Sequence, residues 1–68
     1  MLTQRELEIV DLVTLGDTNQ MIASRLGLAF YTVQTHVSNI FDKLGLSSRL
    51  QVALWRLSRG NDENHRRI

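Results

Sequence analysis

The side chains that could carry out acid–base or nucleophilic chemistry are few in this chain and are not arranged for it. The sequence has no cysteine and two histidines, His36 in the middle and His65 near the carboxyl end. Catalysis needs a nucleophile beside a positioned base, a set of metal ligands, or paired carboxylates in a pocket, and no spacing here predicts any of these. With 68 residues there is also little room for a cleft. The sequence therefore argues against an enzyme, a metal site and a bound cofactor.

Hydrogen-bonding side chains gather instead on one face of residues 31–44. Apolar residues recur in this segment at spacings of three and four, which predicts a helix with one face toward a core. These apolar residues are Val33, Val37, Ile40, Phe41 and Leu44. The opposite face carries Gln34, Thr35, Ser38 and Asp42. The segment is therefore an amphipathic helix whose outer face is polar but not strongly charged.

Three more helices are predicted around this segment. Proline is absent, so the glycines are the main breaks, and each follows a segment with helical apolar spacing, where glycine readily adopts the positive φ of a helix end. They are Gly16, Gly27, Gly45 and Gly60. The expected helices are residues 4–15, 19–26, 31–44 and 48–59. This pattern predicts an all-α, compact four-helix domain over residues 1–60, followed by a flexible polar tail, 61–68.

Capping motifs mark where the other three helices begin. Thr3 and Glu6 form a T-x-x-E capping box, in which each side chain accepts a hydrogen bond from an otherwise unpaired backbone amide. Ser48 and Gln51 form a second, S-x-x-Q box. Thr18 is placed to cap residues 19–26. The starts of these helices therefore follow from short stretches of sequence.

The first and last predicted helices differ in how much of their apolar surface a single core can bury. In the first helix the core stripe is expected to be Leu7, Val10 and Val13, flanked by Ile9, Leu12 and Leu15. The acidic residues of this helix are expected to face solvent. The last helix carries Leu50, Val52, Ala53, Leu54, Trp55 and Leu57, which are too many for one stripe. Part of this surface is expected to be covered by a partner.

The overall charge does not by itself indicate a ligand, since a net charge of +1 is too small to diagnose nucleic-acid binding. Its distribution is uneven: residues 1–17 carry one basic and four acidic side chains, whereas residues 18–60 carry five basic and one acidic. No stretch reaches the ~20 apolar residues of a membrane span. The amino end also has no basic-then-apolar leader. These features predict a cytoplasmic protein that does not bind a membrane.

The spacing of Ala23, Gly27 and Val33 is that of a helix-turn-helix unit. Two closely crossing helices need a small residue at their contact, the turn between them needs a positive φ, and the second helix needs a branched apolar anchor. A plain helical hairpin inside a bundle uses the same residue types. The spacing alone therefore leaves nucleic-acid binding and simple packing equally open.

Nearly the whole chain, from Leu2 to about Leu57, resembles the LuxR-type (GerE-like) helix-turn-helix family of bacterial transcriptional regulators. The matching stretches, in the family's order and spacing, are LTQRELEIV (2–10), TNQMIASRLGL (18–28), TVQTHVSNIFDKLGL (32–46) and SSRLQVALW (47–55). The resemblance implies a domain that binds double-stranded DNA with its third helix in the major groove and commonly dimerises through its fourth. It implies no small-molecule ligand, and RNA polymerase is a further candidate partner.

The resemblance also assigns roles by position. The family's base-contacting side chains fall at Gln34, Thr35 and Ser38, and the cations with which it contacts phosphate or braces the domain fall at Lys43 and Arg49. Two positions depart from the family's pattern. Gln34 stands where the family usually has lysine, and its amide can bond an adenine edge instead of a phosphate or guanine. Ala29 stands where the family often has serine, which removes an N-cap.

Further phosphate contacts are expected at Asn19, Gln20, Arg25, Tyr31, Thr32 and His36. Asn19 and Gln20 lie where the amino end of a helix would meet the DNA backbone, and a solvated turn is the equal alternative. His36 either contacts phosphate or, more commonly for such a position, packs with a hydrogen bond. Tyr31 either reaches the backbone or packs, with Phe30, at the start of its helix.

The mechanism that these assignments predict is a weak homodimer on an inverted repeat, with two recognition helices in successive major grooves. The dimer contact is expected at Val52, Trp55 and Arg56, with the core as the alternative place for Trp55. Arg56 would also join Arg25, Lys43 and Arg49 in neutralising phosphates.

Two other functions stay open at this point. One is a protein-interaction module, because the polar face lacks lysine and the net charge is low. The other is a sigma-factor region 4, which is similar in LTxRE and in its helix-turn-helix but usually has arginines in the recognition helix. The family usually attaches the domain to an amino-terminal receiver or ligand-sensing domain, and the sequence does not decide whether such a domain belongs to this protein.

Overall fold

Four helices and their connecting turns make up the computed structural model, which describes the backbone of residues 1–66 and the side chains of residues 1–59. The helices are α1 (Gln4–Thr14), α2 (Asn19–Leu26), α3 (Phe30–Leu44) and α4 (Arg49–Arg66). No strand occurs in this part of the chain, so the predicted all-α, four-helix class is confirmed. The first three helices agree with the predicted segments to within one residue at each end, which is the usual uncertainty of a helix boundary.

Local hydrogen bonds at the helix ends explain this agreement. The capping box at the start of α1 is complete: the Glu6 backbone N–H donates to Thr3 Oγ1 at 3.1 Å, and the Thr3 backbone N–H donates to Glu6 Oε1 at 2.7 Å. Thr18 Oγ1 accepts from the Met21 backbone N–H at the start of α2. Gly27 ends α2 in the left-handed conformation, at φ 66°. Side-chain oxygens and a residue without Cβ thus satisfy these ends without help from tertiary contacts.

The ends of α3 and α4 differ from this pattern. Ala29 precedes α3 and provides no side-chain cap, as its residue type predicts. Ser48 Oγ accepts from the Gln51 backbone N–H, but the Gln51 side chain accepts from Ser47 rather than from Ser48. The predicted S-x-x-Q box is therefore only half formed, because the Gln51 side chain bonds the residue before the cap.

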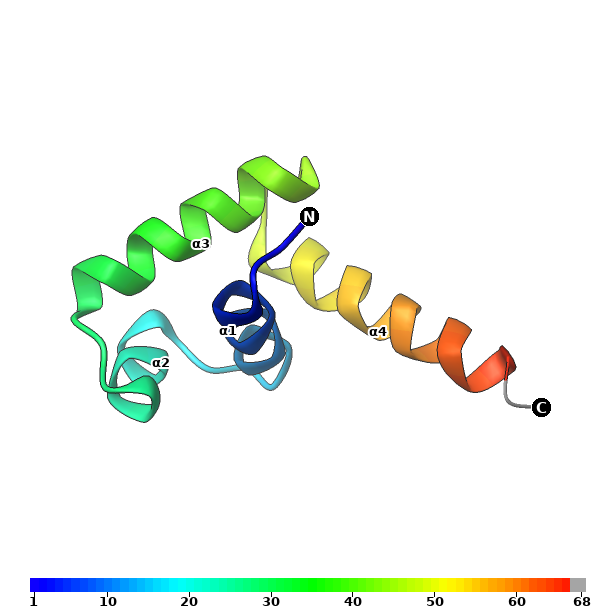
Figure 1. The fold of residues 1–68 in the computed structure, drawn as a ribbon, viewed down its shortest axis with the longest axis horizontal. Coiled ribbons are helices and arrows are strands. Elements are labelled where there is room, and N and C mark those ends of the chain that lie inside the picture. Colours follow the sequence, from blue (N-terminus) through cyan, green and yellow to red (C-terminus); the bar gives the residue numbers. More distant parts are fainter. Residues whose placement is uncertain (67–68) are drawn as a thin grey trace.

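α1 lies at the centre of the fold, with α2 and α3 on one side of it and α4 running outward on the other (Figure 1). It packs against all three other helices, most extensively against α4. α2 and α3 pack against each other as the helix-turn-helix pair that Ala23, Gly27 and Val33 predict. The amino-terminal half of α3 projects beyond α1 in this arrangement. Residues along one long face of α3 are exposed, so the other described elements leave this face uncovered.

The core takes residues from all four helices. Its buried members are Ile9, Val10, Val13, Ile22, Ala23, Val33, Val37, Ile40 and Val52. The predicted inward residues Val33, Val37 and Ile40 of α3 are buried. In α1, Val10 and Val13 are buried as predicted, but Ile9 is fully buried in place of Leu7, which is 37% exposed, and Leu15 is 78% exposed. α1 has apolar residues over a broad arc, and the positions of α3 and α4 around it decide which side is the inside.

α4 is longer than expected, since it passes through Gly60 and ends at Arg66 instead of near Arg59. Glycine weakens a helix but does not stop it, and no proline follows. The prediction of a flexible tail concerns residues 61–68, whose side chains lie outside the described residues. It stays a prediction.

Candidate nucleic-acid interface

The uncovered face of α3 carries a row of exposed polar side chains. Tyr31, Thr35, Ser38 and Asp42 follow one another at spacings of four, three and four, so they form a stripe along the middle of this face. All four are exposed, and Gln34 is exposed beside them. The structure thus brings the three predicted base-contacting residues, Gln34, Thr35 and Ser38, to one accessible surface.

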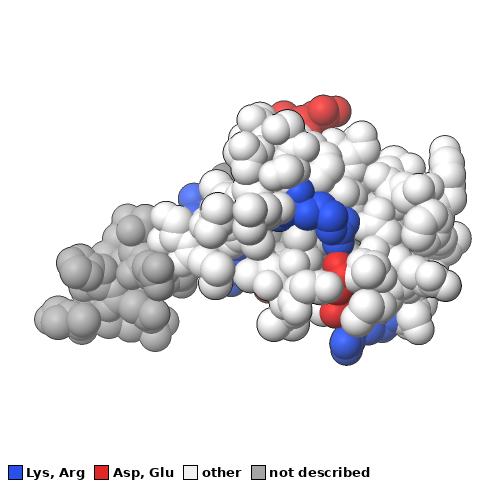
Figure 2. Space-filling model, turned by 180° about the vertical axis from the view of Figure 1, so that it is seen from behind, with Lys and Arg blue, Asp and Glu red and all other residues white. Residues whose placement is uncertain are grey.

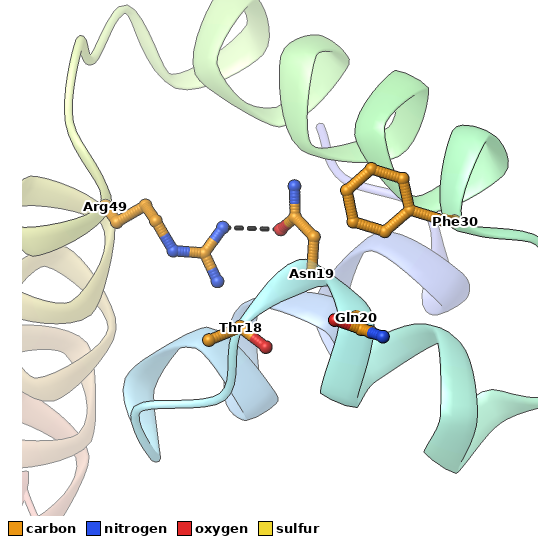
Figure 3. A pocket seen from close by; sticks show the side chains of 5 residues that line it. All are labelled: Thr18, Asn19, Gln20, Phe30 and Arg49. Carbon is orange, nitrogen blue, oxygen red and sulfur yellow. Dashed lines mark hydrogen bonds between the residues drawn. The ribbon is translucent and has the colours of Figure 1, made fainter.

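The amino end of this face adjoins an open depression of about 430 Å³, lined by Thr18, Asn19, Gln20, Phe30 and Arg49 (Figure 3). Three of these residues are the first residues of α2, α3 and α4. Arg49 is held by two short hydrogen bonds: Nη1 donates to Asn19 Oδ1 and Nη2 to the Asp17 carbonyl oxygen, both at 2.6 Å. The guanidinium is therefore fixed against the start of α2 before any ligand arrives.

Arg25 and Lys43 lie beside carboxylates. Arg25 Nε lies 2.6 Å from Asp17 Oδ2, as an ion pair without hydrogen-bond alignment. Asp17 is 5% exposed, whereas the Arg25 side chain is 58% exposed. Lys43 Nζ donates to Glu6 Oε1 at 2.8 Å. Both predicted phosphate contacts are thus neutralised within the domain, although each cation remains partly open to solvent.

The prediction that the acidic residues of the first helix face solvent is wrong for Glu6, which is buried and only 4% exposed. The hydrogen bonds from Lys43 and from the Thr3 backbone hold the pKa of Glu6 below its ordinary value, against the opposing effect of burial. The sequence predicted the capping box, in which Glu6 pairs with the nearby Thr3. It did not predict the bond between Lys43 and Glu6, because no sequence spacing connects these two distant residues.

Each lysine and arginine within residues 1–59 has an intramolecular partner. Besides the three above, Arg5 pairs with Glu8, Arg56 with Asp11, and Arg59 lies over the Trp55 ring at 5.1 Å. Figure 2 shows one face of the molecule, on which the charged side chains that are visible are few and mostly adjoin one another amid uncharged surface. The interface candidate is therefore polar and sparsely charged rather than a basic patch.

The other predicted contacts lie around this surface. Asn19 is half-buried and Gln20 is exposed at the start of α2, and Tyr31 is exposed at the start of α3. Thr32 and His36 are half-buried on the flank of α3. Asn39, which sequence reasoning did not single out, is exposed next to Ser38 and could have been found from its helical spacing.

The predicted dimer residues on α4 divide into two groups. Val52 is 1% exposed and belongs to the domain's own core, so it cannot be a contact between two copies. This corrects the prediction, since α1 covers the side of α4 on which Val52 lies. Trp55 and Arg56 are half-buried. The apolar residues of α4 that remain exposed are Leu50, Leu54 and Leu57, at 68%, 56% and 53%.

The described residues also bear on metal binding and on membrane insertion. They contain no group of three or more histidine, cysteine or acidic side chains close enough to hold a metal ion. None of the helices in the described part is both long and apolar enough to cross a membrane.

Comparison with known proteins agrees with this geometry. The family model of the bacterial regulatory proteins of the luxR family matches residues 1–56, which span α1, α2, α3 and the first eight residues of α4. The response regulator protein VraR of Staphylococcus aureus (strain NCTC 8325 / PS 47) is 47% identical over 55 residues. VraR of Staphylococcus epidermidis (strain ATCC 35984 / RP62A) is also 47% identical over 55 residues.

The match covers 81% of this chain but 26% of each of these relatives. The chain therefore corresponds to about a quarter of the length of the curated relatives that it matches. Because the family model spans all of the helix-turn-helix and the sequence motifs occur in the family's order, the chain belongs to the LuxR family of bacterial regulatory proteins and forms its helix-turn-helix DNA-binding domain.

Proposed function

We propose that this domain reads a specific sequence of double-stranded DNA by placing α3 in the major groove, and that it does so as a dimer on an inverted repeat. The observation that carries the proposal is the exposed polar stripe on α3, beside whose amino end Arg49 is anchored in the depression that Phe30 also lines. The major groove admits a helix, and its base edges present hydrogen-bond donors and acceptors to amide and hydroxyl side chains. Gln34 and Ser38 are the proposed hydrogen-bonding readers.

Phosphate contacts would hold α3 in register. Arg49, Asn19 and Gln20 line one depression at the amino ends of three helices, where backbone N–H groups favour an anion. Arg49 keeps N–H groups beyond the two that it uses within the domain, so it can bind a phosphate without losing its present bonds. Arg25, Lys43, Tyr31, Thr32 and His36 are proposed as flanking contacts.

The dimer is proposed to form through α4. Leu50, Leu54 and Leu57 expose apolar surface at spacings of four and three, which is the pattern of a helix that packs against another helix. Trp55 and Arg56 lie next to this surface and would border the contact. Two-fold symmetry would then place the two α3 helices on matching half-sites.

By analogy with relatives that are named response regulators, we propose that the domain is the output module of such a regulator and is not an enzyme. RNA polymerase stays a candidate partner. A longer protein could also supply an input domain, since the relatives are about four times as long as the part that matches.

The experiment that tests this function is selection from a random duplex pool at low and at physiological salt, followed by sequencing of the retained DNA. Enrichment of an inverted repeat, with binding that weakens steeply as salt rises, is the expected result. The double variant Gln34→Ala, Ser38→Ala should bind the selected site with reduced selectivity. Retention without any enriched sequence would contradict specific reading.

A second function is favoured by one observation: four of the six lysines and arginines within residues 1–59 are paired with carboxylates of the domain. Such a surface would attract DNA weakly and would suit a protein partner docked on the leucines of α4. If no duplex is retained at either salt concentration, this protein-interaction function replaces DNA binding.

A further inference from the structure

Thr35 occupies a central place in the exposed stripe of α3. It lies one helical turn after Tyr31 and one turn before Ser38, and no other element of the described structure covers it. A side chain at this place would be among the first to meet the base edges if α3 enters the major groove. Its chemistry therefore bears directly on which base the domain prefers.

The hydroxyl of Thr35 is already used within the helix. Its Oγ1 donates a hydrogen bond to the Tyr31 carbonyl oxygen, one turn earlier, at 3.2 Å. Threonine has one hydroxyl proton, so this bond leaves Thr35 without a donor for a base. The other branch of the side chain ends in the γ-methyl group, which forms no hydrogen bond.

Ser38 provides the contrast on the same stripe. Within the described residues its hydroxyl makes no hydrogen bond, so it can donate to or accept from a base edge. Thr35 and Ser38 thus have similar residue types but different chemistry toward a ligand. The difference in hydrogen-bond donors comes from the bond between Thr35 and the Tyr31 carbonyl oxygen.

We propose that Thr35 is a specificity residue that recognises the C5-methyl group of a pyrimidine through its own methyl group. This inference rests on the proposed function and deepens it. The C5-methyl group projects into the major groove, where an apolar side chain can contact it. Thymine and 5-methylcytosine both carry this group, so the experiment must distinguish the two bases.

The experiment uses the selected duplex and measures Kd for the wild-type chain, Thr35→Val and Thr35→Ser. In one arm each thymine in turn is replaced by deoxyuridine, and in the other each cytosine is replaced by 5-methylcytosine. Removal of one methyl group per half-site from the contacted thymine should weaken wild-type binding about threefold to tenfold. Thr35→Val keeps the methyl group and should show the same dependence, whereas Thr35→Ser should bind both duplexes equally.

Thr14 offers a matched control, because its Oγ1 makes the same kind of bond to the Val10 carbonyl oxygen in α1, away from the stripe. Thr14→Ser should keep the wild-type dependence on the DNA methyl group. A gain in affinity in the 5-methylcytosine arm alone would assign the contact to 5-methylcytosine instead of thymine.

Two results would overturn the inference while leaving the proposed function intact. One is a duplex whose binding no methyl substitution alters. The other is a Thr35→Ser variant that keeps the methyl dependence while Thr35→Val loses it, which would assign the reading to the hydroxyl. Failure to bind any duplex would instead overturn both proposals.

Discussion

Lys43 Nζ lies 2.8 Å from Glu6 Oε1, although 37 positions separate the two residues in the chain. The bond joins the last turn of α3 to the first turn of α1. Glu6 is buried and also closes the capping box of α1, so one carboxylate both caps a helix and connects two helices. The position of α3 relative to the core therefore depends in part on this single side chain.

Replacement of Glu6 by glutamine should destabilise the domain. The variant keeps the volume of the side chain but loses the charge that pairs with Lys43 and weakens the capping box, so we expect a loss of about 2 kcal/mol in the free energy of unfolding. Urea denaturation followed by circular dichroism measures it. Glu8→Gln in the same helix is the control, since the Arg5–Glu8 pair is exposed and should contribute well below 1 kcal/mol. Equal losses in the two variants would contradict a special role for Glu6.

The same carboxylate predicts a pH dependence of stability. Because the pKa of Glu6 is lowered in the folded state, its contribution is fully present above the ordinary value of 4.5 and is lost as the pH falls through the folded value. The difference in urea midpoint between wild type and Glu6→Gln should therefore be constant near neutral pH and shrink below about pH 4.5. A difference that stays constant down to pH 3 would show that Glu6 stabilises the fold without its charge.

Arg49 should contribute to DNA affinity without contributing to sequence preference. Since it is proposed to bind a phosphate, Arg49→Ala should weaken binding to all duplexes by about tenfold and reduce the salt slope by about one. Asn19→Ala removes the partner that orients Arg49 and should weaken binding by a smaller factor, with Arg49 still charged. Fluorescence anisotropy on the selected site and on a scrambled duplex separates affinity from specificity. A change of preferred sequence in Arg49→Ala would contradict this role.

Asp42 is the acidic residue of the α3 stripe, and its charge would face the DNA phosphates. Asp42→Asn should strengthen binding about twofold to fivefold at low salt, and this gain should diminish as salt rises because the repulsion is screened. Glu8→Gln changes the net charge of the chain equally on α1 and serves as the control. If Asp42→Asn instead weakens binding to a site with a cytosine at one position, Asp42 accepts a hydrogen bond from that base.

Charge placed on the exposed leucines of α4 should separate dimer formation from folding. Leu54→Glu should leave the helical content intact and lower the dimer fraction in sedimentation, because Leu54 is 56% exposed. Val52→Glu should instead unfold the domain, because it buries an unpaired carboxylate in the core. A dimer that persists in Leu54→Glu and in Leu57→Glu would exclude this face of α4 from the interface.

The number, order and starts of the helices could be predicted from the chain alone, because these features depend on residues within one or two turns of each other. Thr3 with Glu6, Thr18 with Met21, and Gly27 at φ 66° all act locally. The inward residues of α2 and α3 could be predicted for the same reason, since each of these helices has a single apolar stripe. α1 and α4 have wider apolar arcs, which left more than one choice of inner face.

Only the tertiary structure determined which face of α1 and which face of α4 is buried. α1 and α4 pack against each other so that Ile9 and Val52 are inside while Leu7, Leu15 and Leu54 are left outside. The pairs between Lys43 and Glu6 and between Arg49 and Asn19 also arise only when the helices assemble, because they join residues 37 and 30 positions apart. Local spacing carries no information about the angle at which two helices cross, and that angle determines which distant side chains meet.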